Sequence, residues 1–313
     1  MTNGAGGERF GMRWGFGAGT DLRSVAEARE AARWADAAGF DGLWISHANG
    51  VDPVLAAACV ADDVPRLTEV GTSVTPLYGR HPIAVGQLVR SAQSALRGRF
   101  TFGVGASSAG VVAERFGAGW DNPLGYTREF LDALVPLLAG EPAAVEGRQI
   151  TARAELGIDA PDTPILIAAL GPKMLALAGA RTAGTSLGQC GPKTIASYVA
   201  PAIQEAAEKA GRPEPRIMAL VRICVTDDHA GAYRLAEQIS AFYAAIPSYA
   251  HVIAMEGLAA PADLHLIGSW DQVLEGLAAY GEAGATDLRI GIAAHTPEAA
   301  AATREALAAH LSG

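Results

Sequence analysis

From residue 13 onward, segments with the hydrophobic pattern of β-strands alternate almost without a break with segments patterned as α-helices. Parallel strands need a crossover connection, usually a helix, so this alternation is typical of a parallel α/β fold. The predicted strands are 13–17, 42–46, 68–74, 100–104, 164–168, 185–188, 216–225 and 287–292. Eight strands in series, most of them followed by a helix, favour a single (β/α)8 TIM barrel over an open doubly wound sheet.

The predicted helices complete this barrel and leave three long connections. The helices are 24–38, 53–61, 82–94, 126–138, 172–182, 192–210, 230–245, 270–283 and 297–311. No internal repeat or linker divides the chain, so we expect one barrel domain over residues 13–313, preceded by a flexible glycine-rich tail over residues 1–12. Segments 105–125, 139–163 and 246–269 exceed an ordinary βα connection, and we expect them to be long insertion loops at the C-terminal mouth that contact a substrate.

Composition narrows the possible partners. A net charge of −9 with 50% hydrophobic residues argues against a nucleic-acid-binding or basic membrane-surface protein, because both kinds of protein need an excess of positive charge. We expect a small-molecule substrate. The three cysteines show no CxxC spacing, and no signal peptide or membrane-spanning stretch is seen, which predicts a cytoplasmic location. The 21 arginines against three lysines indicate a GC-rich bacterial source, such as an actinobacterium.

Two of the three lysines occur in the same tripeptide, Gly171-Pro172-Lys173 and Gly191-Pro192-Lys193, each at the start of a predicted helix. A helix start presents unpaired backbone N–H groups and the positive end of the helix dipole, so a nearby lysine completes an anion site. Each tripeptide taken alone is more often a capped turn with a solvated lysine. Two of them in consecutive β-α units favour one phosphate held from both sides.

The C-terminal ends of barrel strands are where catalytic groups of such enzymes lie. Here these ends are 46–47, 73–76, 105–108, 169–171 and 189–191, and glycine, small and hydroxyl residues dominate them. They carry no carboxylate cluster, no histidine pair at metal spacing and no nucleophile motif, so no metal is expected. Strand ends of this kind suit a flat organic cofactor that lies against the backbone. The cofactor would then carry out the chemistry.

Within these ends, His47 is the only histidine, and it could hydrogen-bond a cofactor carbonyl or donate a proton. A polar loop histidine with neither role is an equal alternative. The segment 103–108 looks like a dinucleotide fingerprint, but Ser108 replaces its third glycine and no ribose-binding acid follows, so we reject a Rossmann fold. Tyr243 and Tyr249 could cover either a substrate or a dimer partner.

Four ordered segments resemble the bacterial-luciferase-like superfamily: Thr72-Ser73-Val74-Thr75-Pro76, Arg80-His81-Pro82-Ile83, the run from Gly98 to Gly105, and the run from Ala168 to Met174. Within the superfamily the chain is most similar to the coenzyme F420-dependent oxidoreductases of actinobacteria. The resemblance implies a (β/α)8 barrel, usually a homodimer, that binds a deazaflavin at its C-terminal mouth. FMN is the less favoured cofactor.

The resemblance also implies roles for particular residues. It predicts a non-prolyl cis peptide bond between Ser73 and Val74 that presses against the deazaflavin ring, and it puts the cofactor phosphate near 170–173 and 189–191. The candidate catalytic residues are His47 and Ser108. The candidate cofactor-binding residues are His47, Ser73, Val74, Thr75, Gly105, Ala106, Ser107, Leu170, Gly171, Pro172, Lys173, Gln189, Cys190, Gly191 and Lys193.

Family members that oxidise a sugar phosphate carry an Asp-His pair after the second strand and a glutamate near the position of Ser108. This chain has only His47 and Ser108 at these positions, and oxidation of a sugar phosphate is therefore not expected. The resemblance favours an F420-dependent reductase that transfers hydride to a C=C or C=N bond of a small organic substrate, such as a secondary metabolite. The alternatives are an FMN-dependent monooxygenase and a non-catalytic flavin- or deazaflavin-binding protein.

Overall fold

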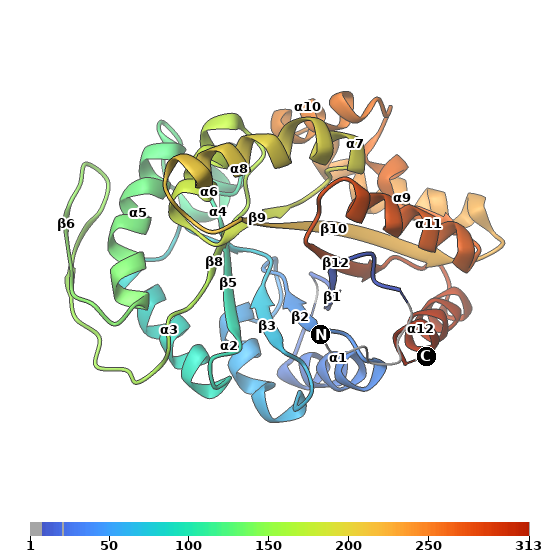
Figure 1. Cartoon of the computed structure of the whole chain (residues 1–313), viewed down its shortest axis with the longest axis horizontal. Coiled ribbons are helices and arrows are strands. Elements are labelled where there is room, and N and C mark those ends of the chain that lie inside the picture. Colours follow the sequence, from blue (N-terminus) through green and yellow to red (C-terminus); the bar gives the residue numbers. More distant parts are fainter. Residues whose placement is uncertain (1–7, 21, 313) are drawn as a thin grey trace.

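The computed structural model describes residues 8–20 and 22–312. Within them, eight parallel strands form a closed barrel surrounded by helices (Figure 1). The strands are β1 (Arg13–Gly17), β2 (Gly42–Ile45), β3 (Glu69–Thr72), β5 (Phe100–Gly105), β8 (Ile165–Ile167), β9 (Gly184–Leu187), β10 (Arg216–Val225) and β12 (Asp287–Ile292). β12 pairs with β1, with Arg13 opposite Asp287, and this pairing closes the ring. The predicted (β/α)8 barrel is confirmed.

The helices that connect these strands follow the predicted order. They are α1 (Val25–Ala38), α2 (Pro53–Cys59), α3 (Pro82–Ala95), α5 (Pro123–Leu138), α6 (Pro172–Arg181), α9 (His229–Ala244), α11 (Trp270–Glu282) and α12 (Pro297–Ser312). The helix predicted over 192–210 begins as α7 (Pro192–Thr194), passes through a π-helical turn (Ile195–Val199) and continues as α8 (Ala200–Lys209). No helix in the described part of the chain has the length and apolar character needed to cross a membrane.

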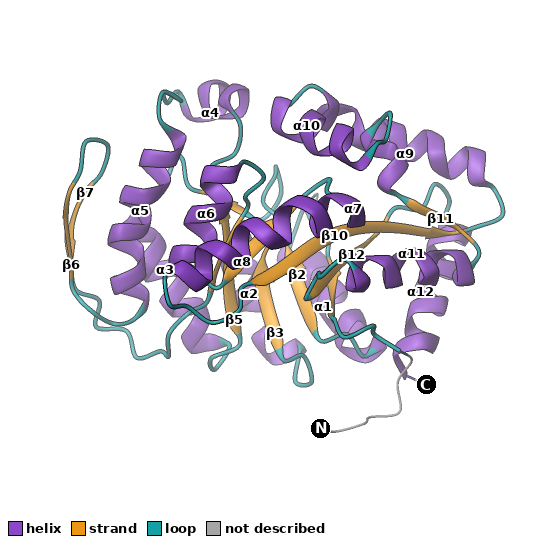
Figure 2. Ribbon diagram, turned by 45° about the horizontal axis from the view of Figure 1, so that its top comes forward, coloured by secondary structure: helices purple, strands orange, loops and turns teal. Residues whose placement is uncertain are grey.

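The three long segments predicted as loops contain regular structure. Segment 105–125 holds α4 (Ala109–Phe116), and segment 246–269 holds α10 (Pro247–Glu256) and β11 (Leu266–Gly268), which extends the sheet beside β10. Figure 2 shows α4 and α10 at the same end of the barrel. Three short elements were also not predicted, namely β4 (Thr75–Pro76), which pairs with β5, and the 3-10 turns Ala61–Asp63 and Pro261–Leu264.

The third long segment, 139–163, forms an antiparallel hairpin of β6 (Ala143–Glu146) and β7 (Thr151–Ala154). The carboxylate of Glu129 in α5 accepts hydrogen bonds from the backbone N–H groups of Gln149 (2.7 Å) and Ile150 (2.9 Å) in the hairpin turn. The hairpin therefore lies along the outer side of α5 (Figure 2). The expectation that this segment is a loop at the mouth is wrong, because it belongs to the connection that returns from a helix to the next strand.

Residues 8–12, predicted as part of a flexible tail, contact the barrel. The guanidinium of Arg9 forms an ion pair with Asp41 and donates a hydrogen bond to the Gly39 carbonyl oxygen at 3.0 Å. Met12 is buried in the main core. Contacts with the barrel thus begin at residue 8, and the remainder of the predicted tail, residues 1–7, lies outside the described residues.

The middle of the barrel is filled by Trp44 of β2. Its indole ring is buried against Leu166 and Met218. A Cβ atom at Gly15 would lie 2.3 Å from Trp44 Nε1, and one at Gly71 would lie 2.3 Å from Trp44 Cζ3. Glycines on the two neighbouring strands therefore make the space that the large ring needs.

The N-terminal end of the barrel is closed by an ion network on interior positions. Arg216 donates to both carboxylate oxygens of Glu69 at 2.6 and 2.8 Å and to Asp287 Oδ1 at 2.7 Å. Arg13 also pairs with Asp287, at 2.6 Å. These bidentate contacts join β1, β3, β10 and β12 across the barrel. With the middle and the N-terminal end filled, open space is left at the C-terminal mouth.

We predict that Gly71→Ala destabilises the protein by about 1–3 kcal/mol, because the new methyl group would overpack the interior against Trp44. The matched control is Gly157→Ala, whose new Cβ would meet nothing within 4 Å and should change stability by less than about 0.5 kcal/mol. Urea unfolding followed by circular dichroism measures both. Equal midpoints for the two variants would contradict the packing argument.

Candidate functional site

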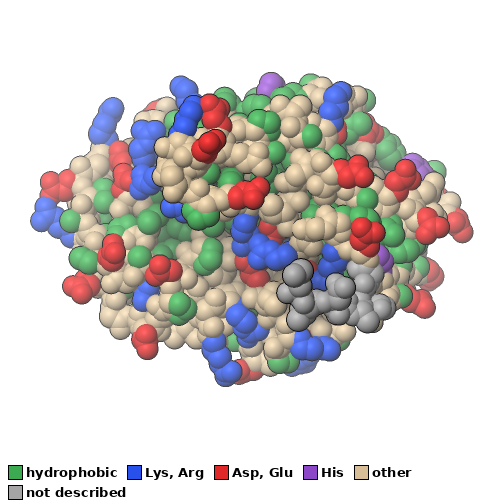
Figure 3. Space-filling view, in the orientation of Figure 1, with side chains coloured by type: hydrophobic (Ala, Val, Ile, Leu, Met, Phe, Trp, Pro, Cys, Tyr) green, Lys and Arg blue, Asp and Glu red, His purple; other side chains and the backbone are tan. Residues whose placement is uncertain are grey.

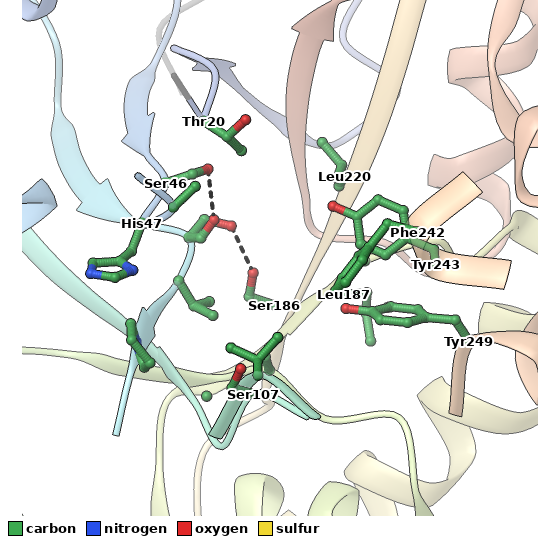
Figure 4. A pocket seen from close by; sticks show the side chains of 18 of the residues that line it. Thr20, Ser46, His47, Ser107, Ser186, Leu187, Leu220, Phe242, Tyr243 and Tyr249 are labelled. Atoms are coloured by element: carbon green, nitrogen blue, oxygen red, sulfur yellow. Dashed lines mark hydrogen bonds between the residues drawn. The ribbon is translucent and has the colours of Figure 1, made fainter. Parts of the chain in front are cut away.

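A cavity of about 420 Å³ opens at the C-terminal mouth of the barrel. Its inner part is built from the ends of β2, β3, β5, β8, β9, β10 and β12, and its outer part from α4, α9 and α10. Figure 4 shows His47 on one side of this space and Tyr243 and Tyr249 on the other. The position agrees with the location of active sites in barrels of this kind, and the volume is within the range of small-molecule sites.

The floor of the cavity is a buried polar layer of Ser46, Ser73, Ser186 and Arg289. Ser46 Oγ donates to the Ser73 carbonyl oxygen at 3.0 Å, and Ser73 Oγ lies 3.0 Å from Ser186 Oγ. The Arg289 guanidinium donates to Ser73 Oγ at 3.3 Å and also to Ser46 Oγ. Side chains within or directly after four strands, β2, β3, β9 and β12, thus form a single hydrogen-bonded layer, and Ser46 in this layer follows Trp44 by two residues along the chain.

One wall of the cavity, termed the flat wall, is formed by backbone peptide planes and small side chains. It contains the cis peptide bond between Ser73 and Val74, which confirms the expectation from the resemblance. Gly105 and Ala168 continue this wall, and a Cβ atom at Gly105 would lie 3.0 Å from Ala168 Cβ and 3.1 Å from Val74 Cγ2. Backbone and small side chains therefore form a surface on which a flat ring can lie.

Aromatic side chains of α9 and α10 form the opposite wall. Tyr243 and Tyr249 line the cavity together with Phe242 (Figure 4), so the two tyrosines lie where they could cover a substrate. A Cβ atom at Gly188 would lie 3.3 Å from the Tyr249 hydroxyl, which shows how closely α10 approaches β9. Burial raises the pKa of Tyr249 to about 12, so its hydroxyl stays protonated at neutral pH.

His47 follows β2 and is half-buried in the cavity wall. Burial lowers its pKa below the ordinary value of 6.5, and the nearby Arg80 guanidinium lowers it further, against the opposing effect of Asp52. The Asp52 carboxylate has its own partners, because it caps α2 by accepting hydrogen bonds from the N–H groups of Val54 and Leu55 (3.0 Å each) and forms an ion pair with Arg80. His47 is therefore predominantly neutral at pH 7, with one ring nitrogen able to accept a proton and the other able to donate a hydrogen bond.

The first predicted phosphate site, Gly171-Pro172-Lys173, begins α6 and is exposed. No side chain caps this helix start, and a Cβ atom at Gly171 would meet nothing within 4 Å. The chain reaches this point three residues after Ala168, which lines the cavity. Leu170 anchors the approach, since its carbonyl oxygen accepts a hydrogen bond from the Tyr198 hydroxyl at 3.0 Å. The helix start is thus open to an anion.

The second predicted phosphate site, at Gly191-Pro192-Lys193, already holds a carboxylate of the same chain. Glu256 in α10 accepts hydrogen bonds from the backbone N–H groups of Lys193 (3.0 Å) and Thr194 (2.8 Å). A Cβ atom at Gly191 would lie 2.3 Å from the Glu256 carboxyl carbon. A phosphate would have to displace this carboxylate, so the two helix starts are not equivalent.

The remaining candidate residues divide between the cavity and its surroundings. His47, Ser73, Val74, Gly105 and Ser107 line the cavity as expected. Thr75 and Ala106 are buried beside it, and Gln189 and Cys190 are buried at the end of β9, outside its lining. Ser108 is the N-cap residue of α4 and lies outside the cavity lining, so its catalytic role stays a prediction.

Sequence reasoning missed several lining residues, above all Arg222 in β10 and Arg289 in β12. A signal was present, because each arginine interrupts an apolar strand at a position whose alternation places it inside the barrel. Ser186, Phe242 and Arg115 were also missed. Arg115 lies on α4, an element that was not predicted at all.

Comparison with known proteins identifies the family. Residues 11–287 match the family described as luciferase-like monooxygenase, and the chain belongs to this family. A 5,10-methylenetetrahydromethanopterin reductase of Methanolobus tindarius is 31% identical over 218 residues, which cover 68% of this chain and 66% of that reductase.

Solved structures share the fold at lower identity. The coenzyme F420-dependent tetrahydromethanopterin reductase from Methanopyrus kandleri is similar with a TM-score of 0.74 and 18% identity, covering 96% of each chain. The oxygenating constituent of 3,6-diketocamphane monooxygenase of Pseudomonas putida, in complex with FMN, is similar with a TM-score of 0.75 and 19% identity, covering 95% of this chain and 97% of that one. At these identities the likeness concerns the barrel and does not distinguish the two cofactors.

We predict that the His47 imidazole titrates below pH 6.5 and that Arg80→Gln raises its pKa, because the substitution removes a neighbouring positive charge. Asp52→Asn should lower the pKa of His47 for the opposite reason. Titration of the histidine side chains by NMR, with His47→Asn to assign the resonance, measures these shifts. Unchanged titration in both charge variants would contradict the electrostatic account.

Proposed function

We propose that the protein is an F420-dependent oxidoreductase, and specifically a reductase that transfers hydride from reduced F420 to a C=C or C=N bond of a small organic substrate. The observation that carries this proposal is the flat wall of Val74, Gly105 and Ala168 facing a cavity with aromatic side chains opposite. Two relatives support the redox assignment. The methylenetetrahydromethanopterin reductase of Methanolobus tindarius is 31% identical, and the coenzyme F420-dependent tetrahydromethanopterin reductase of Methanopyrus kandleri shares the fold.

The residues present fit such a cofactor. The cis peptide at Ser73-Val74, together with Gly105 and Ala168, would support one face of the ring. The uncapped start of α6 at Gly171 and Lys173 would hold the phosphate through backbone N–H groups and the lysine charge. When bound, reduced F420 supplies a hydride. The second helix start, covered by Glu256, is not included in this proposal.

The side chains of the cavity then position the acceptor and handle the proton. Tyr243 and Tyr249 cover the space opposite the flat wall and limit the access of water. His47 lies at the cavity edge, and its protonated form would donate a proton to the reduced product. Its lowered pKa favours the neutral form, which would accept a proton when the reaction runs in reverse. The small number of ionisable groups agrees with chemistry that depends on orientation.

The second candidate is an FMN-dependent monooxygenase. The observation in its favour is that the Pseudomonas putida structure with FMN shares this barrel as closely as the F420-dependent reductase does. The uncapped helix start of α6 would suit the phosphate of either cofactor. Identifying which cofactor the protein binds therefore distinguishes the two functions.

Fluorescence titration of the purified protein with F420 and with FMN tests the assignment. We expect F420 to bind and FMN to bind much more weakly. Oxidation of reduced F420 in the presence of unsaturated acceptors, followed by absorbance without oxygen uptake, would then support a reductase. Tight binding of FMN with no binding of F420 would reject the proposal in favour of the monooxygenase.

We predict that Lys173→Ala weakens F420 binding by about 1–3 kcal/mol, roughly 5- to 150-fold in Kd, through loss of a charge-assisted hydrogen bond. Lys193→Ala should have a smaller effect, because Glu256 already occupies its helix start. The control is Lys209→Ala, an exposed lysine that pairs with Glu205 on α8. The phosphate assignment is wrong if Lys173→Ala and Lys209→Ala bind F420 equally well.

A further inference from the structure

The cavity is positively charged although the chain as a whole is acidic. Its lining contains three arginines, Arg115, Arg222 and Arg289, and no aspartate or glutamate among the residues that the structure describes. The chain carries a net charge of −9, and basic and acidic side chains are interspersed on the face shown in Figure 3. A cationic cavity inside an anionic protein is an arrangement that attracts an anion to this site.

Arg289 is the most deeply placed of the three. Its side chain is 8% exposed, and no ion pair involves it among the described residues. Its neighbours on the floor are neutral hydroxyls, Ser73 Oγ at 3.3 Å and Ser46 Oγ. Its Nε atom is buried without a hydrogen-bond partner in the described structure. A guanidinium has five N–H donors, so most of its donor capacity is unused.

Arg222 stands one step closer to the mouth on the neighbouring strand. Leu220 of β10 lies opposite Arg289 of β12 in the sheet register, and Arg222 follows two residues later on the same interior side. The Arg222 guanidinium lies 5.7 Å from the centre of the Tyr243 ring. In the described part of the chain it too forms no ion pair. The two arginines thus line one continuous path from the floor to the mouth.

Burying a positive charge without a counter-ion is costly. Burial and the proximity of Arg222 lower the pKa of Arg289 to about 10, so the group is still charged at neutral pH. The described residues supply no carboxylate to offset these charges. A bound anion would supply the compensating negative charge. The planar, two-oxygen geometry of a carboxylate matches the paired N–H donors of a guanidinium.

We propose that Arg222 and Arg289 bind a carboxylate group of the substrate, so that the hydride acceptor is an organic acid. This rests on the proposed function for the identity of the reaction, while the anion site itself stands on the arginines and the cavity. The uncapped start of α6 is a separate place for a cofactor phosphate, and it leaves the two arginines to the substrate.

The test compares two probes of nearly the same size, benzoate and its uncharged analogue benzamide, by isothermal titration calorimetry on the full chain. We expect benzoate to bind about tenfold or more tightly than benzamide, the scale of one charge-assisted contact. Arg222→Gln and Arg289→Gln should each remove this preference. Arg153→Gln, which makes the same charge change on the exposed β7, should retain it.

Two outcomes of the comparison between benzoate and benzamide would overturn the proposal. One is equal affinity for benzoate and benzamide in the wild-type protein. The other is a preference that persists in Arg222→Gln, a half-buried position that keeps the test valid even if the buried Arg289→Gln variant does not fold.

Titration of Arg222→Gln with F420 separates this proposal from the proposed function. Unchanged F420 affinity with lost benzoate binding assigns the arginine to the substrate. A parallel loss of F420 affinity assigns it to the cofactor and overturns the substrate site. If the wild-type protein binds benzoate selectively but does not bind F420, the anion site stands and the F420 assignment fails.

Discussion

The packing of Trp44 inside the barrel is the contact on which the rest of the structure depends. The ring fits only because Gly15 and Gly71 carry no Cβ atoms, and the network of Arg216, Glu69 and Asp287 closes the space beneath it. These two layers fill the barrel from its N-terminal end upward. Since close-packed interiors leave few voids, the remaining interior space lies at the mouth, and this space is the cavity.

The site that follows from this packing separates tasks by element. Strand ends supply the rigid parts, namely the flat wall at Val74 and the polar floor with Arg289. The aromatic wall comes from helices instead, with Tyr243 on the barrel helix α9 and Tyr249 on the additional helix α10. Sites carried on strands are held more precisely than sites on loops. The carboxylate of Glu256 links α10 to the start of α7 through hydrogen bonds, and this link holds the aromatic wall against the barrel.

Much of the fold and part of the site could be predicted from sequence. Strand periodicity located β10 and β12 with their observed bounds, and the segment around Ser73-Val74 indicated the cis peptide through its resemblance to a family. Elements outside the barrel repeat were missed, because α4 and α10 are short helices whose pattern does not differ from that of a structured loop. The phosphate site at Lys173 and Lys193 stays a prediction, and sequence spacing could not show that Glu256 already binds the second helix start. The dimer stays a prediction.

By itself, the sequence determined the order of strands and helices, and hence the end of the barrel where a site must form, because local periodicity and short connections allow few topologies. Only the tertiary structure decided what each polar residue faces. Glu256 caps a helix start 62 or 63 residues away, and Arg289 reaches Ser73, 216 residues away. Contacts at such separations depend on how the barrel closes and on which strands become neighbours. The charge of the cavity therefore appears only once the chain has folded.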